Sequence, residues 1–213
     1  MSNITYMPDF KPRFKYSRPM HIFLESGLLK RMPRSGWFMA GVENPESVAE
    51  HSWRAAVIAY FFAKEEGLDP YKCATMAVFH DIAETRVWDI PWLPRRRGYL
   101  QKDEKKAARE LLQDDELYEL WRQVDDKDTP EGKLVKDAEY FEMAITAYEY
   151  TREGYESARE WADNLEGVWR TEVAKKYYAE LRKLGPEGIA EFWKWFANGL
   201  PGEEIDINKS RDT

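Results

Sequence analysis

The segment Cys73-Ala74-Thr75-Met76-Ala77-Val78-Phe79-His80-Asp81-Ile82-Ala83-Glu84 is the most apolar part of this chain, and it contains an adjacent histidine and aspartate. Burying an imidazole and a carboxylate is unfavourable unless both have hydrogen-bond partners or bind a metal ion. A second histidine, His51, lies 29 residues upstream of His80 in another apolar helical segment, residues 49–56. Two of the three histidines in the chain therefore fall in its two most hydrophobic predicted helices. This arrangement indicates a metal site between helices.

The two predicted helices that carry these histidines are long. The first opens at Pro45-Glu46-Ser47 and runs to Gly67, with Pro45 suited to a first helical turn and Gly67 to a C-cap. The second opens at Asp69-Pro70, with the aspartate as N-cap, and continues to about Glu84. Both are apolar on most faces, so we expect them to be central and covered by other helices. Residues 87–94 contain two prolines and are predicted to form a loop.

Almost every other periodic segment of the chain is also helical. Further helices are predicted at residues 21–30, 101–113, 115–124, 156–165, 168–184 and 187–198, and a long one begins at Thr129-Pro130-Glu131. No strand-type alternation of useful length and no internal repeat is present. The sequence therefore predicts an all-α single domain whose last helices pack onto the core.

The composition limits the class of protein. The chain has 213 residues, of which 43% are hydrophobic and 33% charged, as in a soluble globular protein. The net charge of −7 argues against a nucleic-acid partner, because binding to phosphate backbones requires a basic face. A small anionic substrate needs only a few cations in a cleft and remains compatible with this charge. The single cysteine, Cys73, cannot form an internal disulfide and is expected to fill the core.

Nothing in the sequence suggests a membrane partner or an export signal. The longest uninterrupted apolar run, residues 55–63, is too short to span a bilayer, which requires about 20 residues. The first residues lack the charged and apolar regions of a signal peptide. We therefore expect a cytoplasmic protein.

The position of Glu84 relative to the His-Asp pair points to catalysis. Glu84 follows His80 by four residues and Asp81 by three, so that on one helix all three side chains project toward a common edge. Such a layout suits a metal-activated water with an acid/base partner. The alternative is a buried hydrogen-bonded pair followed by an exposed helix end. The placement of His51 in a second apolar helix favours the metal site.

Three motifs together resemble one family. Pro45-Glu46-Ser47-Val48-Ala49-Glu50-His51-Ser52, Phe79-His80-Asp81-Ile82-Ala83-Glu84 and Asp89-Ile90-Pro91 resemble the HD-domain metal-dependent phosphohydrolases, in particular their 5'-deoxynucleotidase branch. Residues 29–37, 141–143 and 147–150 match the same branch. The match spans about residues 20–152. It implies a single HD-domain helical bundle over this range, with extra C-terminal helices over about 153–200 and a tail over 201–213.

The resemblance implies a set of metal ligands. It assigns this role to His51, His80 and Asp81, and to an aspartate on a later helix; Asp81 is also a candidate catalytic residue. Motif register puts the last ligand at Glu139, whereas the nearest aspartate is Asp137. These two residues are about 200° apart around a helix, so they cannot both face the metal. Alignment with the family motif favours Glu139 as the ligand, whereas the position of the apolar face of this helix slightly favours Asp137. Two imidazoles and two carboxylates suit one divalent ion, such as Mn, Co, Zn or Mg.

The resemblance also implies roles in substrate binding and proton transfer. Glu84 would act as the acid/base residue, Arg34 would bind the phosphate, and Trp37 would line the nucleotide pocket. Asp89 would accept a hydrogen bond from the sugar hydroxyl and discourage a 2'-hydroxyl. Two residues separate Arg34 from Trp37, which makes the assignment of Arg34 less certain than that of Trp37. Arg31 is therefore the alternative candidate for the phosphate-binding arginine.

The predicted function is a divalent-metal-dependent phosphohydrolase that removes phosphate from (deoxy)nucleoside 5'-monophosphates by means of a metal-activated water. One alternative is an HD-type nucleoside triphosphate phosphohydrolase, for which Arg95-Arg96-Arg97 would supply extra cations. Another is a non-catalytic nucleotide-binding helical protein in which the metal has only a structural role and connects helices. The presence of Glu84 and Asp89 argues against this non-catalytic alternative, because a purely structural metal site requires neither residue.

Two further expectations concern support and assembly. Arg54 lies one turn after His51, where it either supports the metal site from behind or pairs with Glu50. The last third of the chain is rich in tryptophan, which we interpret as core and interface anchors. Since members of the resembling family are often dimers, a homodimer is compatible with this pattern.

Overall fold

The computed structural model describes residues 15–91 and 101–198, apart from the side chains of residues 101–103. The helices are α1 (Arg18–Ser26), the 3₁₀ helices η1 (Gly27–Arg31) and η2 (Ser35–Ala40), α2 (Val48–Glu66), α3 (Pro70–Phe79), α4 (Glu84–Val87), α6 (Gln101–Leu112), α7 (Asp115–Asp126), α8 (Pro130–Arg152), the 3₁₀ helix η3 (Glu156–Ala158), α9 (Arg159–Asp163) and α10 (Glu172–Ala197). Within these ranges an isolated bridge between Pro33 and Ser47 is the only β-type pairing. The prediction of an all-α fold is therefore confirmed. Arg95–Arg97, the end of the predicted loop and the predicted tail lie outside the described residues.

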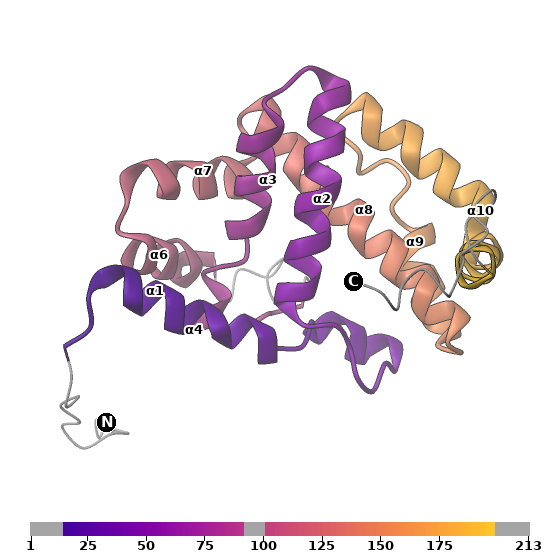
Figure 1. Cartoon of the computed structure of the whole chain (residues 1–213), viewed down its shortest axis with the longest axis horizontal. Coiled ribbons are helices and arrows are strands. Elements are labelled where there is room, and N and C mark those ends of the chain that lie inside the picture. Colours follow the sequence, from indigo (N-terminus) through magenta and orange to yellow (C-terminus); the bar gives the residue numbers. More distant parts are fainter. Residues whose placement is uncertain (1–14, 92–100, 199–213) are drawn as a thin grey trace, which may run out of the picture.

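Helix α2 occupies the middle of the molecule, with α3 beside it and α8 and α10 on its other side (Figure 1). A capping box fixes its start: the Glu50 N–H donates to Ser47 Oγ at 3.2 Å, and the Ser47 N–H donates to Glu50 Oε2 at 2.6 Å. The helix therefore begins at Val48, and Pro45 precedes it instead of occupying its first turn. Its end is as predicted, because Gly67 adopts a left-handed conformation with φ of 72°.

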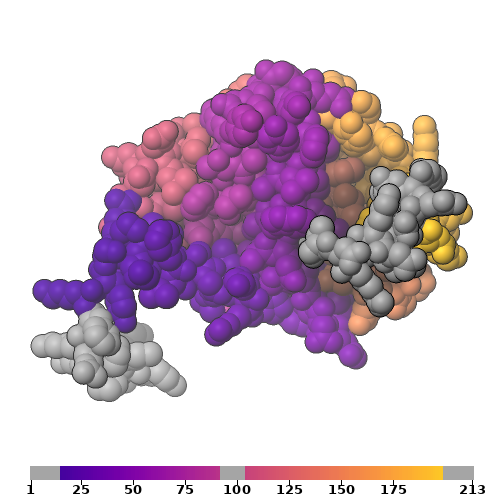
Figure 2. All heavy atoms as spheres, in the orientation of Figure 1, coloured from indigo at the N-terminus to yellow at the C-terminus, as the bar shows by residue number. Residues whose placement is uncertain are grey.

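Within residues 15–91 and 101–198, no helix covers one face of α2, contrary to the expectation that other helices cover it. The space-filling view shows that α2 and α3, in purple and magenta, form the middle of the molecular surface on this side (Figure 2). Trp53, Val57 and Phe61 follow one another at four-residue spacing along α2, and all three are exposed, Trp53 to 69%. The central position predicted for α2 is therefore correct, but its complete coverage is not.

Helix α3 ends at Phe79, so the prediction of a helix continuing to Glu84 is wrong. His80 donates from Nδ1 to the carbonyl oxygen of Ala77 at 2.6 Å, and thus its side chain uses an oxygen near the end of the helix. The backbone then tightens into turns, in which the Glu84 N–H donates to the carbonyl oxygen of Asp81 at 3.0 Å. Helix α4 begins only at Glu84. The His-Asp pair therefore lies on a turn between two helices.

Helix α10 bends sharply at Gly185, which has φ of 60° and ψ of −173° and is followed by Pro186. Glycine tolerates this positive φ, and proline is suited to the first turn of the segment that follows. The bend separates the two helices predicted at 168–184 and 187–198. The first of them starts later than predicted, because Thr171 is its N-cap and accepts a hydrogen bond from the Ala174 N–H.

The buried side chains form two hydrophobic clusters. The larger cluster lies mainly between α2, α3, α8, α9 and α10, and includes Ala56, Ala59, Phe62, Met76, Ala77, Leu134 and Trp169. The smaller cluster lies around η1, α6 and α7, and includes Leu29, Val48, Ile82, Ala83, Leu111 and Trp121. Cys73 belongs to the larger cluster as a fully buried core residue, as predicted. No helix among the described residues is both long and apolar enough to cross a membrane.

Candidate metal centre

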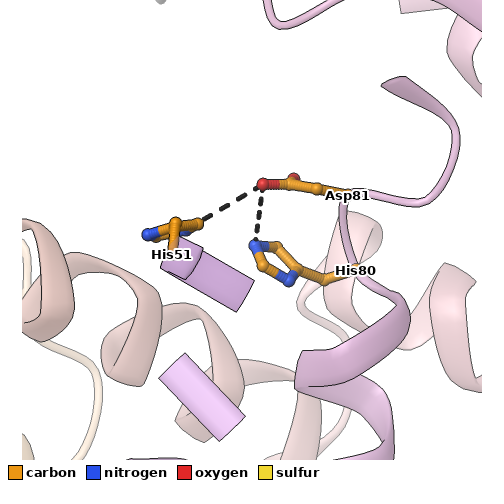
Figure 3. Close-up of side chains that lie close together, drawn as sticks. All are labelled: His51, His80 and Asp81. Atoms are coloured by element: carbon orange, nitrogen blue, oxygen red, sulfur yellow. Dashed lines mark ion pairs between the residues drawn. The ribbon is translucent and has the colours of Figure 1, made fainter. Parts of the chain in front are cut away.

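His51, His80 and Asp81 converge on one point, although they come from two different elements (Figure 3). Asp81 Oδ2 lies 3.0 Å from His80 Nε2 and 3.9 Å from His51 Nε2. One potential ligand atom from each residue lies within 4.8 Å of the others. All three side chains are buried. Helix α2 contributes His51, and the turn after α3 contributes the other two.

The hydrogen bonds of the two imidazoles orient both rings toward Asp81. His51 donates from Nδ1 to the carboxylate of Glu142, and His80 donates from Nδ1 to the carbonyl oxygen of Ala77. Each ring therefore presents an unprotonated Nε2, and both Nε2 atoms are buried without a hydrogen-bond partner among the described residues. Buried nitrogens without partners are unfavourable. Coordination to a metal ion would satisfy both of them, so the residues fit such an ion.

The electrostatics of the metal-free site favour the metal-binding protonation states of His51 and Asp81, whereas those of His80 favour its protonated form. Burial and the nearby Arg34 guanidinium lower the pKa of His51, which keeps its imidazole neutral. Burial alone would raise the pKa of Asp81, but His80 and Arg34 hold it well below its usual range. Burial would lower the pKa of His80, but the carboxylates of Asp81 and Glu139 raise it. Asp81 is therefore ionised and can accept a cation.

Glu139, on α8, lies at the edge of this group. Its Oε1 is 4.0 Å from His80 Nε2 and accepts a hydrogen bond from Lys136 Nζ at 2.7 Å. Its Oε2 is buried without a hydrogen-bond partner among the described residues. Burial opposes ionisation, but Lys136 and His80 outweigh it and lower the pKa of Glu139 to about 2. Glu139 therefore presents a buried carboxylate close to His80, one oxygen of which has no hydrogen-bond partner among the described residues.

Asp137 points to a different part of the molecule. Its Oδ2 accepts hydrogen bonds from the N–H groups of Arg170 and Thr171, both at 2.8 Å, at the start of α10. Its Oδ1 accepts a further bond from the Arg170 guanidinium at 3.1 Å. Because these contacts account for the buried carboxylate, the geometry favours Glu139 over Asp137 as the fourth ligand, in agreement with motif register. The ligand role of Glu139 itself stays a prediction.

Arg34 lies against the same carboxylate that faces the two imidazoles. Its Nη1 is 3.2 Å from Asp81 Oδ2 and 3.8 Å from Asp89 Oδ1. The isolated bridge positions its backbone, because the Arg34 N–H donates to the carbonyl oxygen of Glu46 at 2.8 Å. Burial opposes the charge, but the carboxylates of Asp81 and Asp89 raise the pKa of Arg34. The competing candidate, Arg31, is exposed on η1.

Asp89 and Glu84 complete the acidic side of the group. The carboxylate of Asp89 accepts a hydrogen bond from the Ser35 N–H, and Ser35 Oγ donates to the backbone carbonyl oxygen of Asp89 at 2.7 Å. Ser35 is therefore a supporting residue that sequence reasoning missed. Glu84, the first residue of α4, is 1% exposed, and it contributes to the raised pKa of Arg34. It is therefore not an exposed helix end.

Trp37 is more deeply buried than a pocket wall requires. The residue is 2% exposed, its indole N–H donates to Glu46 Oε1 at 3.0 Å, and its ring centroid lies 5.2 Å from that of Tyr150. These contacts tie η2 to α8. The predicted role of Trp37 in lining the nucleotide pocket stays a prediction.

Glu142, on α8, is an important residue that sequence reasoning did not single out. It accepts the hydrogen bond of His51 and, through Oε1, one from Arg54 Nε at 2.9 Å. Arg54 therefore supports the site from behind and does not pair with Glu50, which belongs to the capping box of α2. The available signal was spacing, since Glu142 follows Glu139 by three residues on one helix face.

Comparisons with known proteins agree with this geometry. A family described as "HD domain" matches residues 26–182. The chain is 40% identical over 172 residues to the 5'-deoxynucleotidase HDDC2 of Bos taurus, covering 78% of this chain and 81% of that protein. The human protein of the same name is 38% identical over 172 residues, with the same coverage. A conserved hypothetical protein from Pyrococcus furiosus has a similar structure, with a TM-score of 0.69, 35% identity, and coverage of 78% of this chain and 99% of that chain. The resemblance predicted from the sequence motifs is confirmed, and the chain belongs to the HD-domain family.

Proposed function

We propose that this protein is a divalent-metal-dependent phosphohydrolase that removes the phosphate from (deoxy)nucleoside 5'-monophosphates. The observation that carries the proposal is that Asp81 Oδ2 faces two buried imidazole Nε2 atoms and also lies 3.2 Å from the Arg34 guanidinium. A candidate metal site with an adjacent phosphate-binding cation suits phosphate ester hydrolysis. The curated relatives from cattle and human, both named 5'-deoxynucleotidase, support the choice of substrate.

In this proposal His51, His80, Asp81 and Glu139 hold one divalent ion, with Mn, Co, Zn and Mg as candidates. When bound, such an ion would lower the pKa of a coordinated water and polarise a phosphoryl oxygen.

The charges of the site support a divalent ion. Arg34 interacts with four carboxylates, which belong to Asp81, Asp89, Glu84 and Glu139. Lys136 is a second cation beside Glu139 and Asp81. The carboxylates around Arg34 outnumber these two cations, and a bound cation would offset the excess negative charge.

The remaining residues would bind substrate and move protons. Arg34 presents several N–H donors to the phosphate, as its fixed guanidinium geometry allows. Glu84 would exchange a proton with the attacking water and the leaving 5'-oxygen. Asp89 would accept a hydrogen bond from the sugar hydroxyl, and Trp37 would support the nucleotide side. Most of the rate enhancement would come from positioning and charge neutralisation.

Phosphate release from dAMP, AMP and dATP, measured with Mg, Mn, Co or Zn and again with a chelator, tests the proposal. We expect release from dAMP in at least one metal and none with chelator. Release from dATP in place of the monophosphates would support the triphosphate alternative, for which the candidate cations Arg95–Arg97 lie outside the described residues. Absence of release from all three substrates with every metal would exclude this enzymatic function.

A homodimer is part of the proposal as well. Exposed aromatic residues on α2, such as Trp53 and Phe61, and on the last part of α10, such as Trp193 and Trp195, offer apolar surface for a second copy. Sedimentation equilibrium checks the assembly, and a monomer at high concentration would contradict it. The cytoplasmic location stays a prediction.

A further inference from the structure

A fully buried hydrogen bond connects the candidate metal centre to α8 from behind. His51 donates from Nδ1 to Glu142 Oε2, and both side chains are 0% exposed. The bond joins α2 to α8 and lies on the side of the imidazole opposite Asp81. The orientation of the His51 ring therefore depends on where the Glu142 carboxylate is held.

The Glu142 carboxylate is itself fixed by neighbours on both helices. Its Oε1 accepts hydrogen bonds from Arg54 Nε and from Thr146 Oγ1, each at 2.9 Å. Arg54 is in turn held by Glu149, whose Oε1 and Oε2 lie 3.0 and 2.8 Å from Nη1. Glu142 therefore cannot rotate away from His51 without breaking charge-assisted bonds in a buried environment.

His80 differs from His51 in the nature of its acceptor. Its Nδ1 donates to the backbone carbonyl oxygen of Ala77, which no side-chain substitution removes. The acceptor for His51 is an ionisable side chain on another helix, which both fixes the tautomer and adds negative charge behind the ring. A carboxylate in that position makes an imidazole a better metal ligand.

We infer that Glu142 is a positioning residue, which holds the His51 imidazole with Nε2 toward Asp81 and thereby sets the affinity of the centre for its metal ion. The inference rests on the proposed function, in which His51 is a ligand. It goes beyond that proposal because it assigns the affinity to a residue that touches neither metal nor substrate.

The test compares Glu142→Gln with a matched control, Glu149→Gln. His51 and Arg54 donate to different oxygens of Glu142, and the substitution replaces one of these oxygens with an NH2 donor, so the amide cannot accept both bonds in the same geometry. Glu149 also holds Arg54, but among the described residues it makes no hydrogen bond or ion pair with His51. The readout is the dissociation constant for Mn²⁺ alone, measured by titration calorimetry on protein whose fold has been checked by circular dichroism.

We expect Glu142→Gln to weaken Mn²⁺ binding by about 10- to 100-fold, and Glu149→Gln to change it by less than about threefold. A second readout is the side-chain ¹⁵N spectrum of His51 in metal-free protein. In wild type and Glu149→Gln, His51 should be a single tautomer protonated at Nδ1. In Glu142→Gln, His51 should no longer be held in this single tautomer. A simple loss of packing would not change the tautomer in this way.

Other outcomes overturn the inference. Equal Mn²⁺ affinity in wild type and Glu142→Gln would show that Glu142 does not determine the metal affinity. Equal weakening of Mn²⁺ binding in Glu142→Gln and Glu149→Gln would show the same. If Glu142→Gln does not fold, Thr146→Val removes one hydrogen bond to Glu142 and is expected to weaken binding at least about threefold; unchanged binding would again contradict the inference. Failure of wild type to bind any of the four metals would overturn the proposed function together with the inference.

Discussion

Asp137 and Glu139 are separated by a single residue on α8, yet their carboxylates serve opposite sides of the helix. Asp137 accepts two backbone hydrogen bonds at 2.8 Å from the start of α10, whereas Glu139 lies 4.0 Å from His80 Nε2. This separation follows from the angle of about 200° between positions two residues apart in a helix. The two acidic residues that the sequence leaves in competition therefore have different surroundings, and their substitutions should have different effects.

We expect Glu139→Ala to weaken Mn²⁺ binding and lower kcat/KM by at least about tenfold, because it removes a ligand oxygen. Asp137→Asn should bind metal as wild type does, but it should lose about 1–3 kcal/mol of unfolding free energy, since it weakens charge-assisted bonds to α10. Metal titration and urea unfolding of both variants check this. The reverse pattern would assign the ligand to Asp137.

Arg34→Met and Arg31→Met form a matched pair for the phosphate-binding role. Arg34 lies 3.2 Å from Asp81, whereas Arg31 is exposed. Loss of a charge-assisted contact with the phosphate should lower kcat/KM for dAMP at least about 100-fold in Arg34→Met, and the Arg31→Met value should stay within about threefold of wild type. Steady-state kinetics with saturating metal measure both. A larger loss in Arg31→Met would reverse the assignment.

Glu84→Gln tests the acid/base role. The side chain is buried at the start of α4, next to the candidate ligands. Removal of a proton-transfer group should lower kcat by about 10²- to 10⁴-fold, while KM changes little. A flattened pH–rate profile should accompany the loss. A rise in KM with unchanged kcat would indicate that Glu84 binds substrate instead.

Glu46 should make the metal-free protein less stable at high pH. Burial and the nearby Glu142 carboxylate raise the pKa of Glu46 to about 8, from 4.5. Between these two values the folded state holds a proton that the unfolded state lacks, so the unfolding free energy falls as the pH rises through this window. The loss attributable to Glu46 is on the order of 5 kcal/mol.

The matched variant for this pH dependence is Glu46→Gln, whose amide oxygen can still accept the Trp37 N–H bond. Its unfolding free energy, measured with chelator between pH 5 and pH 9, should be less dependent on pH than that of wild type. Identical pH dependence in the two proteins would contradict the expected pKa of Glu46.

Local sequence signals predicted the parts of the structure that depend on neighbouring residues. Asp69 accepts hydrogen bonds from the Tyr71 and Lys72 N–H groups, and Thr129 accepts one from the Gly132 N–H, as expected of N-caps. The positions of His51 and His80 in apolar segments also indicated correctly that the two imidazoles lie close together, with ring centroids 5.3 Å apart. Periodicity and capping thus predicted the helices and the convergence of the central histidines.

Long-range contacts account for most of what the sequence did not predict. The partner of His51 Nδ1, Glu142, is 91 residues away, and in the sequence only its three-residue spacing from Glu139 connects it with the site. The end of α3 at Phe79 was missed because a side-chain bond from His80 to a backbone oxygen competes with helix propagation. Ser35 was missed for a similar reason, because its partner Asp89 lies in a distant loop.

The turn that carries His80 and Asp81 has a mechanical consequence for the whole molecule. Just before it, Met76 and Ala77 pack in the larger hydrophobic cluster, and just after it, Ile82 and Ala83 pack in the smaller one. His51 also lies between the two clusters, because Val48 belongs to the smaller and Ala56 to the larger. An ion bound by these three side chains would act as a cross-link between the two clusters and add to the contacts that already join them. Metal loading should therefore bring the hydrogen-exchange rates of α7 and α8 closer together and merge their unfolding into one cooperative transition.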